Sequence, residues 1–304
     1  MKYSLDGGAN WTGITGTSVT IASGITTTSG IKVYQPGNGR TTVDSDPQTI
    51  SVIQAETPTT AAAVNCTTTD NNKGKLIGVT SDMEYQKSGD DGWTPVTGSN
   101  ITNLTPGTYY VRVKATGTAL ASDNQVLTIK SVQTITAQDV TVTYGDTGKS
   151  VSATATGGGA ISYAVKSGSE NYIAVDASTG ALTIKKVPAE GKAYVTVTAA
   201  GTDTCVEATK DATVTINKAN STSATVTANN RTYDGTDKPL VTADESKLVG
   251  GEMQYAVTTE NKAPADNLYT TSIPSKTDAG TYYVWYKVVG DANHNDMMMV
   301  TKVG

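Results

Sequence analysis

Asp278-Ala279-Gly280-Thr281-Tyr282-Tyr283-Val284-Trp285-Tyr286 is the stretch that decides the fold of this chain. Its Asp-Ala-Gly opening predicts a turn, and the alternation that follows predicts a β-strand with two different faces. The face expected to be buried carries Tyr282, Val284 and Tyr286, and the opposite face carries Tyr283 and Trp285. A strand that is apolar on one face predicts a sheet that packs against a second layer.

A turn followed by Tyr-x-Val is typical of strand F in an immunoglobulin-like sandwich. There the Tyr hydroxyl bonds back to the preceding turn, and a cysteine stands two residues later. Val284 occupies the cysteine position, so no inter-sheet disulfide forms there. Pro106-Gly107-Thr108-Tyr109-Tyr110-Val111 repeats the pattern, with Val111 in that place. We therefore predict tyrosine corners at Tyr109 and Tyr282.

The same alternation predicts which side chains are buried, because a slip of one residue would turn every side chain to the other face. The residues expected in the core are Tyr109, Val111, Val113, Tyr282, Val284 and Tyr286. The residues expected to be more exposed are Tyr110, Arg112, Lys114 and Lys287.

An internal repeat sets the number of domains. Met1-Lys2-Tyr3 recurs as Met83-Glu84-Tyr85, and Trp11 recurs as Trp93 at the same spacing. The second copy is preceded by two candidate strands, around 61–66 and 75–79, and the first copy has no such residues before it. We therefore expect residues 1–54 to be an incomplete immunoglobulin-like module that lacks its first strands.

Candidate strands separated by polar turns continue along the rest of the chain at intervals of about 8–12 residues, which is typical of sandwiches. In the first module they are 1–5, 19–22, 31–35 and 49–53. The boundaries predicted for the later modules are 55–130, 131–218 and 219–304. The predicted fold class is all-β: tandem immunoglobulin-like β-sandwich domains in an elongated array.

Composition excludes several classes of protein. The 304 residues carry a formal net charge of −5, which does not favour nucleic acid or an anionic membrane as partner. Phe is absent and there are 15 Tyr, while Thr and Val fill the alternating runs, as in β-rich proteins. No apolar run reaches the roughly 20 residues of a membrane helix. The two cysteines, Cys66 and Cys205, are predicted to be free buried thiols.

Modules 131–218 and 219–304 resemble bacterial immunoglobulin-like repeats of cell-surface proteins, including the MBG and YDG domains. The resemblance rests on Tyr144-Gly145-Asp146, on Tyr233-Asp234-Gly235 and on the closing hairpin at 201–219. It implies an extracellular location at a bacterial cell surface and a structural role. Ala193 stands where modules 55–130 and 219–304 have the corner Tyr, so no tyrosine corner is expected there.

Enzymatic chemistry has little support in the sequence. His294 is the only histidine and lies in a polar turn, away from both cysteines, so no nucleophile–histidine pair is predicted. Asp90-Asp91 and Asp244-Glu245 are paired carboxylates of the kind that glycosidases use, but turns favour the same residues. We assign no catalytic residue and no cofactor, and expect His294→Ala to leave stability nearly unchanged.

The segment Asp291-Ala292-Asn293-His294-Asn295-Asp296 is dense in the oxygen atoms that calcium prefers. A hairpin turn also favours Asp and Asn, because both residues tolerate left-handed backbone and cap their own turns. The order of the ligands matches no calcium loop. We therefore assign no metal ligand and interpret the segment as a turn.

Exposed aromatic residues leave ligand binding as an alternative. Tyr283 and Trp285 point away from the expected core, and such a pair can stack on sugar rings or pack beneath neighbouring side chains. They are the candidate ligand-binding residues. Trp11 and Trp93 recur with the repeat, which favours a shared packing role.

The sequence thus predicts a non-catalytic spacer segment, or stalk, of a bacterial cell-surface or secreted protein. The alternative is an adhesin module that binds a carbohydrate or a host surface protein through Tyr283 and Trp285 or through loops at one end of a sandwich. The chain is expected to be a monomer without nucleic-acid partners or membrane insertion. Strand exchange between molecules is conceivable through the incomplete first module, whose edges are unpaired.

Overall fold

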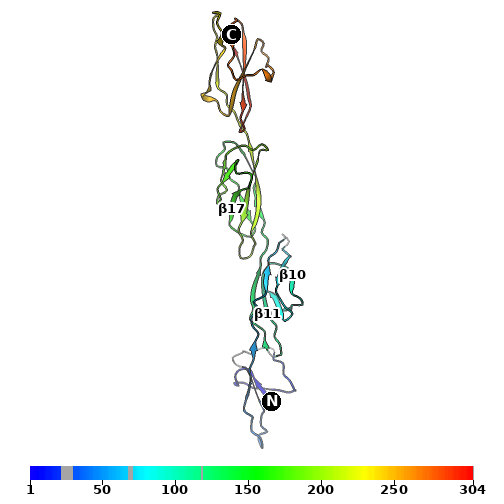
Figure 1. Cartoon of the computed structure of the whole chain (residues 1–304). Coiled ribbons are helices and arrows are strands. Elements are labelled where there is room, and N and C mark those ends of the chain that lie inside the picture. The colour runs from blue at the N-terminus through cyan, green and yellow to red at the C-terminus, as the bar shows by residue number, and fades with distance from the viewer. Residues whose placement is uncertain (22–29, 68–70, 118, 304) are drawn as a thin grey trace. The chain divides into compact units, whose positions relative to one another are not determined.

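The computed structural model describes the backbone of residues 1–21, 30–67, 71–117 and 119–303, and the side chains in these ranges up to residue 299 (Figure 1). Strands dominate, and the helical elements among the described residues are two short 3₁₀ turns, η1 (Glu245–Lys247) and η2 (Asp266–Leu268). The predicted all-β fold class is confirmed.

Contacts divide the chain into two compact units, each of which is described by itself. The first unit holds residues 1–133 together with the loop 201–206, and the second holds 134–200 and 207–304. Buried side chains form three hydrophobic cores, which we call the 61–129, 135–216 and 224–288 cores. The 61–129 core belongs to the first unit and the other two belong to the second.

The described residues of the range 1–54 include a sheet without a hydrophobic core of its own. Its order is β2 (Thr12–Gly13), β1 (Lys2–Ser4), β3 (Ile31–Tyr34) and β4 (Gln48–Ile50). Among the described residues of the range 1–54, no hydrophobic side chain is buried. We call these four strands the N-terminal sheet.

Two of the predicted N-terminal strands differ from the structure. Residues 19–21 are not in a strand, and Ala22 lies outside the described residues. The predicted strand at 49–53 is divided into β4 and β5 (Ile53–Gln54). β5 leaves the N-terminal sheet to pair in parallel with β12 (Ala119–Leu120). The segment that follows the N-terminal sheet is therefore hydrogen-bonded to the next module.

We predict that the N-terminal sheet is the least stable part of the chain. The described residues give this sheet no buried apolar layer, so its hydrogen bonds open at little cost in free energy, and β2 and β4 are its edge strands. In native-state hydrogen exchange, the amides of β1 and β3 should exchange before those of β11 (Gly107–Val113). Protection in β1 and β3 as strong as in β11 would contradict the prediction.

Two facing sheets enclose the 61–129 core. One has the order β10 (Asn100–Leu104), β7 (Gly74–Ile77) and β6 (Ala62–Val64). The other has the order β13 (Gln125–Ile129), β11, β8 (Met83–Lys87) and β9 (Thr94–Pro95). Leu76 of the first sheet and Val111 of the second meet in the core. This arrangement is an immunoglobulin-like sandwich.

The 135–216 core repeats the sandwich with a parallel addition. Its main sheet has the order β15 (Val140–Thr143), β21 (Ala208–Asn217), β20 (Lys192–Ala199) and β17 (Ile161–Val165). β15 runs parallel to β21, with Val142 opposite Ile216. The remaining pairs are β14 (Ile135–Ala137) with β16 (Ala153–Ala155) and β18 (Ile173–Val175) with β19 (Leu182–Ile184).

The 224–288 core has a three-stranded sheet of β26 (Gly251–Thr258), β28 (Tyr282–Gly290) and β30 (Met297–Val303). Shorter pairs complete it: β23 (Thr225–Ala228) with β25 (Val241–Asp244), and β24 (Lys238–Pro239) with β27 (Ser275–Lys276). β22 (Ala219–Asn220) pairs in parallel with β29 (His294–Asn295) at the start of this region.

The predicted assignment of buried and exposed strand faces is confirmed, but two residues are less buried than predicted. Val111 and Val284 are fully buried and Tyr109 is 2 % exposed, whereas Arg112, Lys114 and Lys287 are only partly buried. Val113 and Tyr282, which we expected in the core, are half-buried. Both lie at an end of their strand, β11 or β28, where the facing layer no longer covers them fully.

Both predicted tyrosine corners are present. The Tyr109 hydroxyl donates to the carbonyl oxygen of Thr105 at 2.8 Å, and the Tyr282 hydroxyl donates to that of Asp278 at 3.1 Å. Burial raises the pKa of Tyr109 above its ordinary value. Ala193, which stands at the corresponding place in β20, is fully buried and has no hydroxyl to offer. Cys66 and Cys205 are free and buried, as predicted.

We predict that Tyr109→Phe lowers the free energy of unfolding of the 61–129 sandwich by about 1 kcal/mol, because a part-buried hydrogen bond is lost. Urea unfolding followed by a probe in that sandwich measures the change. Tyr110→Phe is the matched control, since Tyr110 is the next residue and points to the other face. Equal effects of the two substitutions would refute the corner as a stabilising contact.

Candidate functional site

Tyr283 and Trp285, the predicted ligand-binding residues, lie on the outer face of the β26–β28–β30 sheet. Both are half-buried, and they stand opposite Thr258 and Ala256 of β26, respectively. The indole Nε1 of Trp285 donates to the Thr258 hydroxyl at 3.0 Å. The only hydrogen-bond donor of the indole is thus used within the sheet, and the Trp285 ring offers its face and edges rather than a polar group.

A segment of the chain itself covers part of this outer face. Tyr269 follows η2 and is buried, and the ammonium of Lys287 lies 4.5 Å from the centre of its ring. Lys287 also pairs with Asp266 at 3.1 Å. Burial raises the pKa of Tyr269. Sequence reasoning missed this cover, because residues 266–269 carry no periodic signal that links them to β28.

Trp11 and Trp93 have packing partners inside their own sheets, as the repeat predicted. The ring of Trp11 meets that of Tyr34 edge to face, with centres 4.6 Å apart. The guanidinium of Arg112 lies 3.8 Å from the centre of the Trp93 ring and pairs with Glu84 at 2.7 Å. Such contacts stabilise a sheet surface and leave less of each ring available to a ligand.

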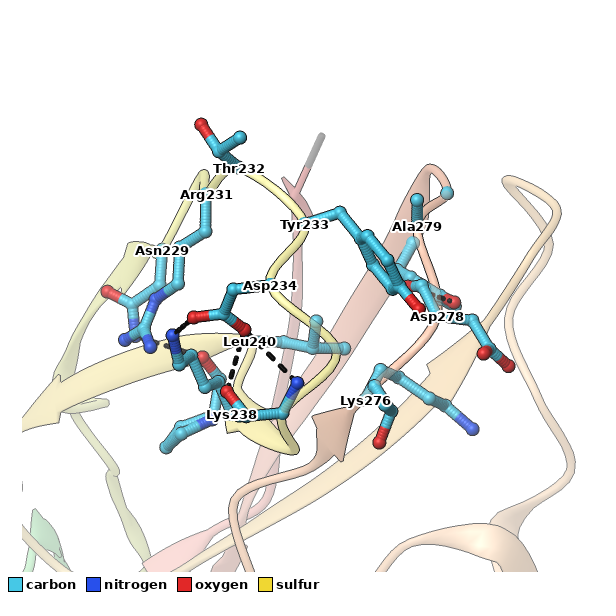
Figure 2. Close-up of a pocket in the computed structure, with 15 residues that line it drawn as sticks. Asn229, Arg231, Thr232, Tyr233, Asp234, Lys238, Leu240, Lys276, Asp278 and Ala279 are labelled. Atoms are coloured by element: carbon cyan, nitrogen blue, oxygen red, sulfur yellow. Dashed lines mark hydrogen bonds and ion pairs between the residues drawn. The ribbon is translucent and has the colours of Figure 1, made fainter.

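A hollow of about 240 Å³ lies at the loop end of the 224–288 core (Figure 2). Its walls come from the segment before and within Tyr233-Asp234-Gly235 and from the turn at Asp278-Ala279-Gly280. Tyr233 is largely exposed at its rim, and Leu240 and Tyr282 lie deeper. The YDG motif and the strand-F turn, far apart in sequence, thus form one site.

The charges around this hollow are only partly paired. Asp234 forms an ion pair with Lys238 and accepts hydrogen bonds from the Thr236 backbone and hydroxyl at 3.1 and 2.7 Å (Figure 2). Arg231 and Lys276 add two cations to the lining. The volume is below the roughly 300–1,000 Å³ of typical small-molecule sites. The hollow contains neither a histidine nor a cysteine that could act as a nucleophile or its base.

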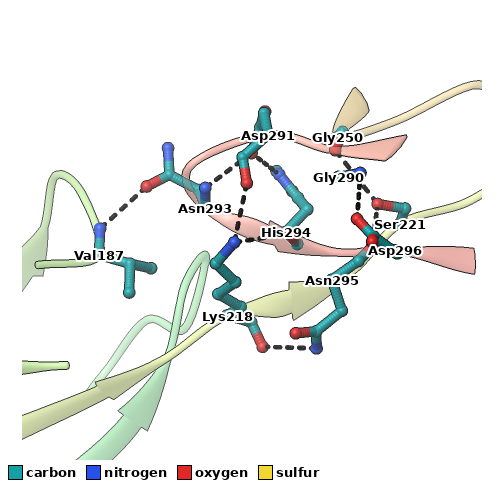
Figure 3. Close-up of polar contacts among 10 residues, drawn as sticks. All are labelled: Val187, Lys218, Ser221, Gly250, Gly290, Asp291, Asn293, His294, Asn295 and Asp296. Carbon is teal, nitrogen blue, oxygen red and sulfur yellow. Dashed lines mark hydrogen bonds and ion pairs between the residues drawn. The ribbon is translucent and has the colours of Figure 1, made fainter. Parts of the chain in front are cut away.

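We interpreted residues 291–296 from the sequence as a turn rather than a calcium site. In the structure this hairpin joins the two cores of the second unit (Figure 3). The Asn293 side-chain oxygen accepts a hydrogen bond from the Val187 backbone at 2.9 Å. The Lys218 ammonium donates to the carbonyl oxygens of Asp291 and His294 at 3.1 and 3.3 Å. Val187 belongs to the 135–216 core, and Lys218 links that core to β22.

The carboxylates of this hairpin are occupied by its own backbone and by His294. Asp291 Oδ1 accepts from the Asn293 backbone, and Asp296 Oδ1 accepts from the Gly290 backbone at 2.8 Å. Within the described residues, no group of three or more His, Cys, Asp or Glu side chains is arranged to hold a metal ion. These oxygen atoms build the turn.

His294 is packed rather than free in solvent. Its Nδ1 lies 2.7 Å from Asp291 Oδ1, and its ring meets that of Tyr144 edge to face at 5.3 Å between centres. The hydrogen bond with His294 is the main reason why the pKa of Asp291 is below its ordinary value. A lowered carboxylate pKa adds stability at neutral pH, which is lost as the pH falls through that lowered value.

These contacts of His294 replace our expectation that His294→Ala leaves stability nearly unchanged with a different prediction. Removal of the ring deletes the contact with Tyr144, and aromatic pairs of this geometry contribute about 0.5–1.5 kcal/mol. We now predict a loss of about 1 kcal/mol in the second unit, measured by chemical unfolding. His294→Phe, which keeps a ring but not Nδ1, separates the ring contact from the hydrogen bond to Asp291. An unchanged unfolding midpoint in His294→Ala would restore the original expectation.

A second linker is held in a similar way inside the first unit. Ser131 donates its backbone N–H to Thr204 at 2.8 Å and accepts from Val206 at 2.9 Å, so the linker pairs with the loop 201–206. The Ser131 hydroxyl lies 3.0 Å from the Cys205 sulfur and lowers the pKa of that thiol. The Gln133 side chain donates to the Val206 carbonyl at 2.8 Å. Cys205 is thus part of a linker contact.

Comparisons with known proteins assign the chain to no family. No protein-family model matches it, MBG and YDG models included, and no curated protein matches it. Solved structures with similarity include human CDH23 EC21-23, at 15 % identity and TM-score 0.29, covering 74 % of this chain and 89 % of that one. Drosophila N-cadherin EC1-4 shows 14 % identity and TM-score 0.31, covering 90 % of this chain and 81 % of that one. Drosophila OTK extracellular domains 3-5 show 13 % identity and TM-score 0.27, covering 83 % and 93 %.

Proposed function

We propose that this chain is a non-catalytic spacer segment of an extracellular protein, built in series from an incomplete module at 1–54 and β-sandwich modules at 55–130, 131–218 and 219–304. The observation that carries the proposal is the hairpin 291–296, whose side chains and backbone bond to Val187 and Lys218 across a module boundary. A spacer needs linkers that restrict the motion of neighbouring modules relative to one another. A hydrogen-bonded linker restricts this motion more than a flexible one.

The hydrogen bonds of three polar side chains also support a spacer role. The side chains that a catalytic or metal site would need, namely His294, Asp291 and Cys205, are each bonded within a linker contact. No helix among the described residues is both long and apolar enough to cross a bilayer. The chain acts as a monomer at a bacterial cell surface, and its modules hold another domain away from that surface.

Limited trypsin digestion tests the spacer proposal at the peptide bond after Lys218. Lys218 lies in the linker and is held by Asp291 and His294, whereas Lys262 lies in an exposed loop. Cleavage after Lys262 should be fast and cleavage after Lys218 slow, because a protease needs a mobile segment. Asn293→Ala should speed cleavage at Lys218, and Asn261→Ala, in the exposed loop, should not. Equally rapid cleavage at both lysines in the unchanged chain would show a loose linker and count against the spacer.

The second candidate function is binding of a carbohydrate or a host surface protein. It is favoured by one observation: Tyr283 and Trp285 lie side by side on an outer sheet face and are only half-buried. Aromatic faces of this kind can stack on sugar rings. A glycan array should then show binding that Tyr283→Ala or Trp285→Ala removes and that Trp93→Ala preserves. Absence of binding, or equal loss in all three variants, would exclude this surface as the site.

A further inference from the structure

Three linkers of this chain share one hydrogen-bonding scheme. In each of them one linker residue donates its backbone N–H to a carbonyl oxygen of a later turn: Ala55 to Leu120 at 3.1 Å, Ser131 to Thr204 at 2.8 Å, and Ala219 to Asn293 at 2.9 Å. The strand pairing agrees, because each linker also runs parallel to the turn segment that it meets. We call Ala55, Ser131 and Ala219 the linker donors.

The residue immediately before the linker donor is a lysine in two of the three linkers. It is Lys130 in one and Lys218 in the other, whereas the first linker has Gln54. The ammonium of Lys130 donates to the carbonyl oxygen of Thr202 at 2.5 Å. That of Lys218 donates to two carbonyl oxygens of the hairpin 291–296 (Figure 3). We call Lys130 and Lys218 the junction lysines.

The two lysine contacts correspond position by position. Thr202 lies two residues before Thr204, which accepts from one linker donor. Asp291 likewise lies two residues before Asn293, which accepts from the other. The side chains of the two turns differ, since one reads Thr-Asp-Thr-Cys and the other Asp-Ala-Asn-His. The contact that recurs is therefore one between a lysine and the backbone of a turn.

An ammonium group suits this place because it is a compact cation with three donors and no acceptor. Its hydrogen bonds to carbonyl oxygens are charge-assisted and stronger than those between neutral groups. Each ammonium adds a second connection between linker and turn beside the bond of the linker donor. Carbonyl oxygens are also ligands that divalent cations accept, so a lysine and a metal ion could serve the same oxygen atoms.

We propose that the junction lysines are the resident cations of these two linkers: each ammonium holds the later turn against the linker, and the order of the linker depends on that charge. The proposal deepens the proposed spacer function and rests on it, since a spacer requires ordered linkers. The first linker has a neutral amide in this place, and the Gln54 side chain donates to the Asp123 carboxylate at 3.1 Å. The device therefore belongs to the two lysine linkers.

Hydrogen exchange of the linker donors in the whole chain tests the proposal. Lys130→Met keeps a long side chain without its charge, and it should accelerate exchange of the Ser131 amide about tenfold and leave the Ala219 amide unchanged. Lys218→Met should do the reverse. Its effect should be smaller, because Lys218 is exposed and Lys130 is half-buried. Lys192→Met, at an exposed lysine of β20, is the control and should change neither amide.

Two further arms separate charge from shape and from metal binding. Lys130→Arg and Lys218→Arg keep a cation with its donors and should retain most of the protection. Equal loss in the methionine and arginine variants would assign the effect to side-chain shape and overturn the proposal. A chelator of divalent ions should change neither amide in the unmodified chain. Faster exchange with the chelator would assign the turn oxygen atoms to a metal ion and would also overturn the proposal.

The spacer function and the role of the junction lysines fail in different ways. Suppose that the methionine variants keep Ser131 and Ala219 protected, while trypsin still cleaves slowly after Lys218 in the unmodified chain. The linkers are then ordered without the lysines, and only the present proposal is overturned. Rapid exchange of Ala219 in the unmodified chain would instead show a loose linker and contradict both proposals.

Discussion

Leu76→Ala is expected to destabilise one sandwich by about 3 kcal/mol and to leave the other two cores untouched. Leu76 is fully buried on β7 at the centre of the 61–129 core. Truncation removes apolar contacts and leaves a cavity that a close-packed layer cannot collapse around. For a domain of this size, such a loss lowers the melting temperature by more than about 10 °C.

Differential scanning calorimetry of the whole chain measures the effect. One transition should move, and the transitions that report the 135–216 and 224–288 cores should stay in place, because those cores share no buried residue with the 61–129 core. Ile77→Ala is the control: Ile77 is the neighbour on the same strand but is 37 % exposed on the other face. A common shift of all transitions would show that the cores unfold as one body and would refute modules in series.

Gly250→Ala should loosen the hairpin 291–296 from the 135–216 core. Gly250 has φ +84°, and a Cβ there would lie 2.2 Å from the His294 ring. Left-handed backbone costs a non-glycine residue about 1–2 kcal/mol, and here the ring must move as well. Because the Gly250 carbonyl also accepts from the Asp291 backbone at 2.9 Å, displacement of the ring disturbs the whole turn.

The measurement is hydrogen exchange at the Val187 amide, which is bonded to Asn293 and should lose protection in Gly250→Ala. Gly168→Ala is the matched control, with φ +91° and nothing within 4 Å of a new Cβ. In a chain that already carries His294→Ala, Gly250→Ala should lower the free energy of unfolding only by as much as Gly168→Ala does, because only the backbone strain remains. An unchanged Val187 amide in Gly250→Ala would mean that the hairpin does not depend on the packing of His294.

Local signals explain what the sequence could predict. The tyrosine corners join residues four positions apart, so Tyr109 and Tyr282 could be placed from their turns alone. The buried faces of β11 and β28 follow from alternation over a single strand. Val113 and Tyr282 were expected to be more buried than they are, because alternation gives the face but not where the opposite layer ends.

Contacts between distant segments explain what the sequence could not predict. Asn293 meets Val187, and His294 meets Tyr144, across more than a hundred residues without a shared periodicity. The turn at 291–296 was visible from its Asp and Asn residues, but its partners were not. Tyr269 is a similar case, since only the fold shows that it lies beside Lys287 on the face of Trp285.

Small-angle X-ray scattering of the whole chain tests the central claim, a spacer of modules in series, most directly. A compact chain of 304 residues would have a radius of gyration of about 19 Å. Modules joined end to end should give a radius well above about 30 Å, with a distance distribution that has a long tail, because a linear array extends along one axis. A radius near the compact value, at concentrations where the chain is monomeric, would contradict the account.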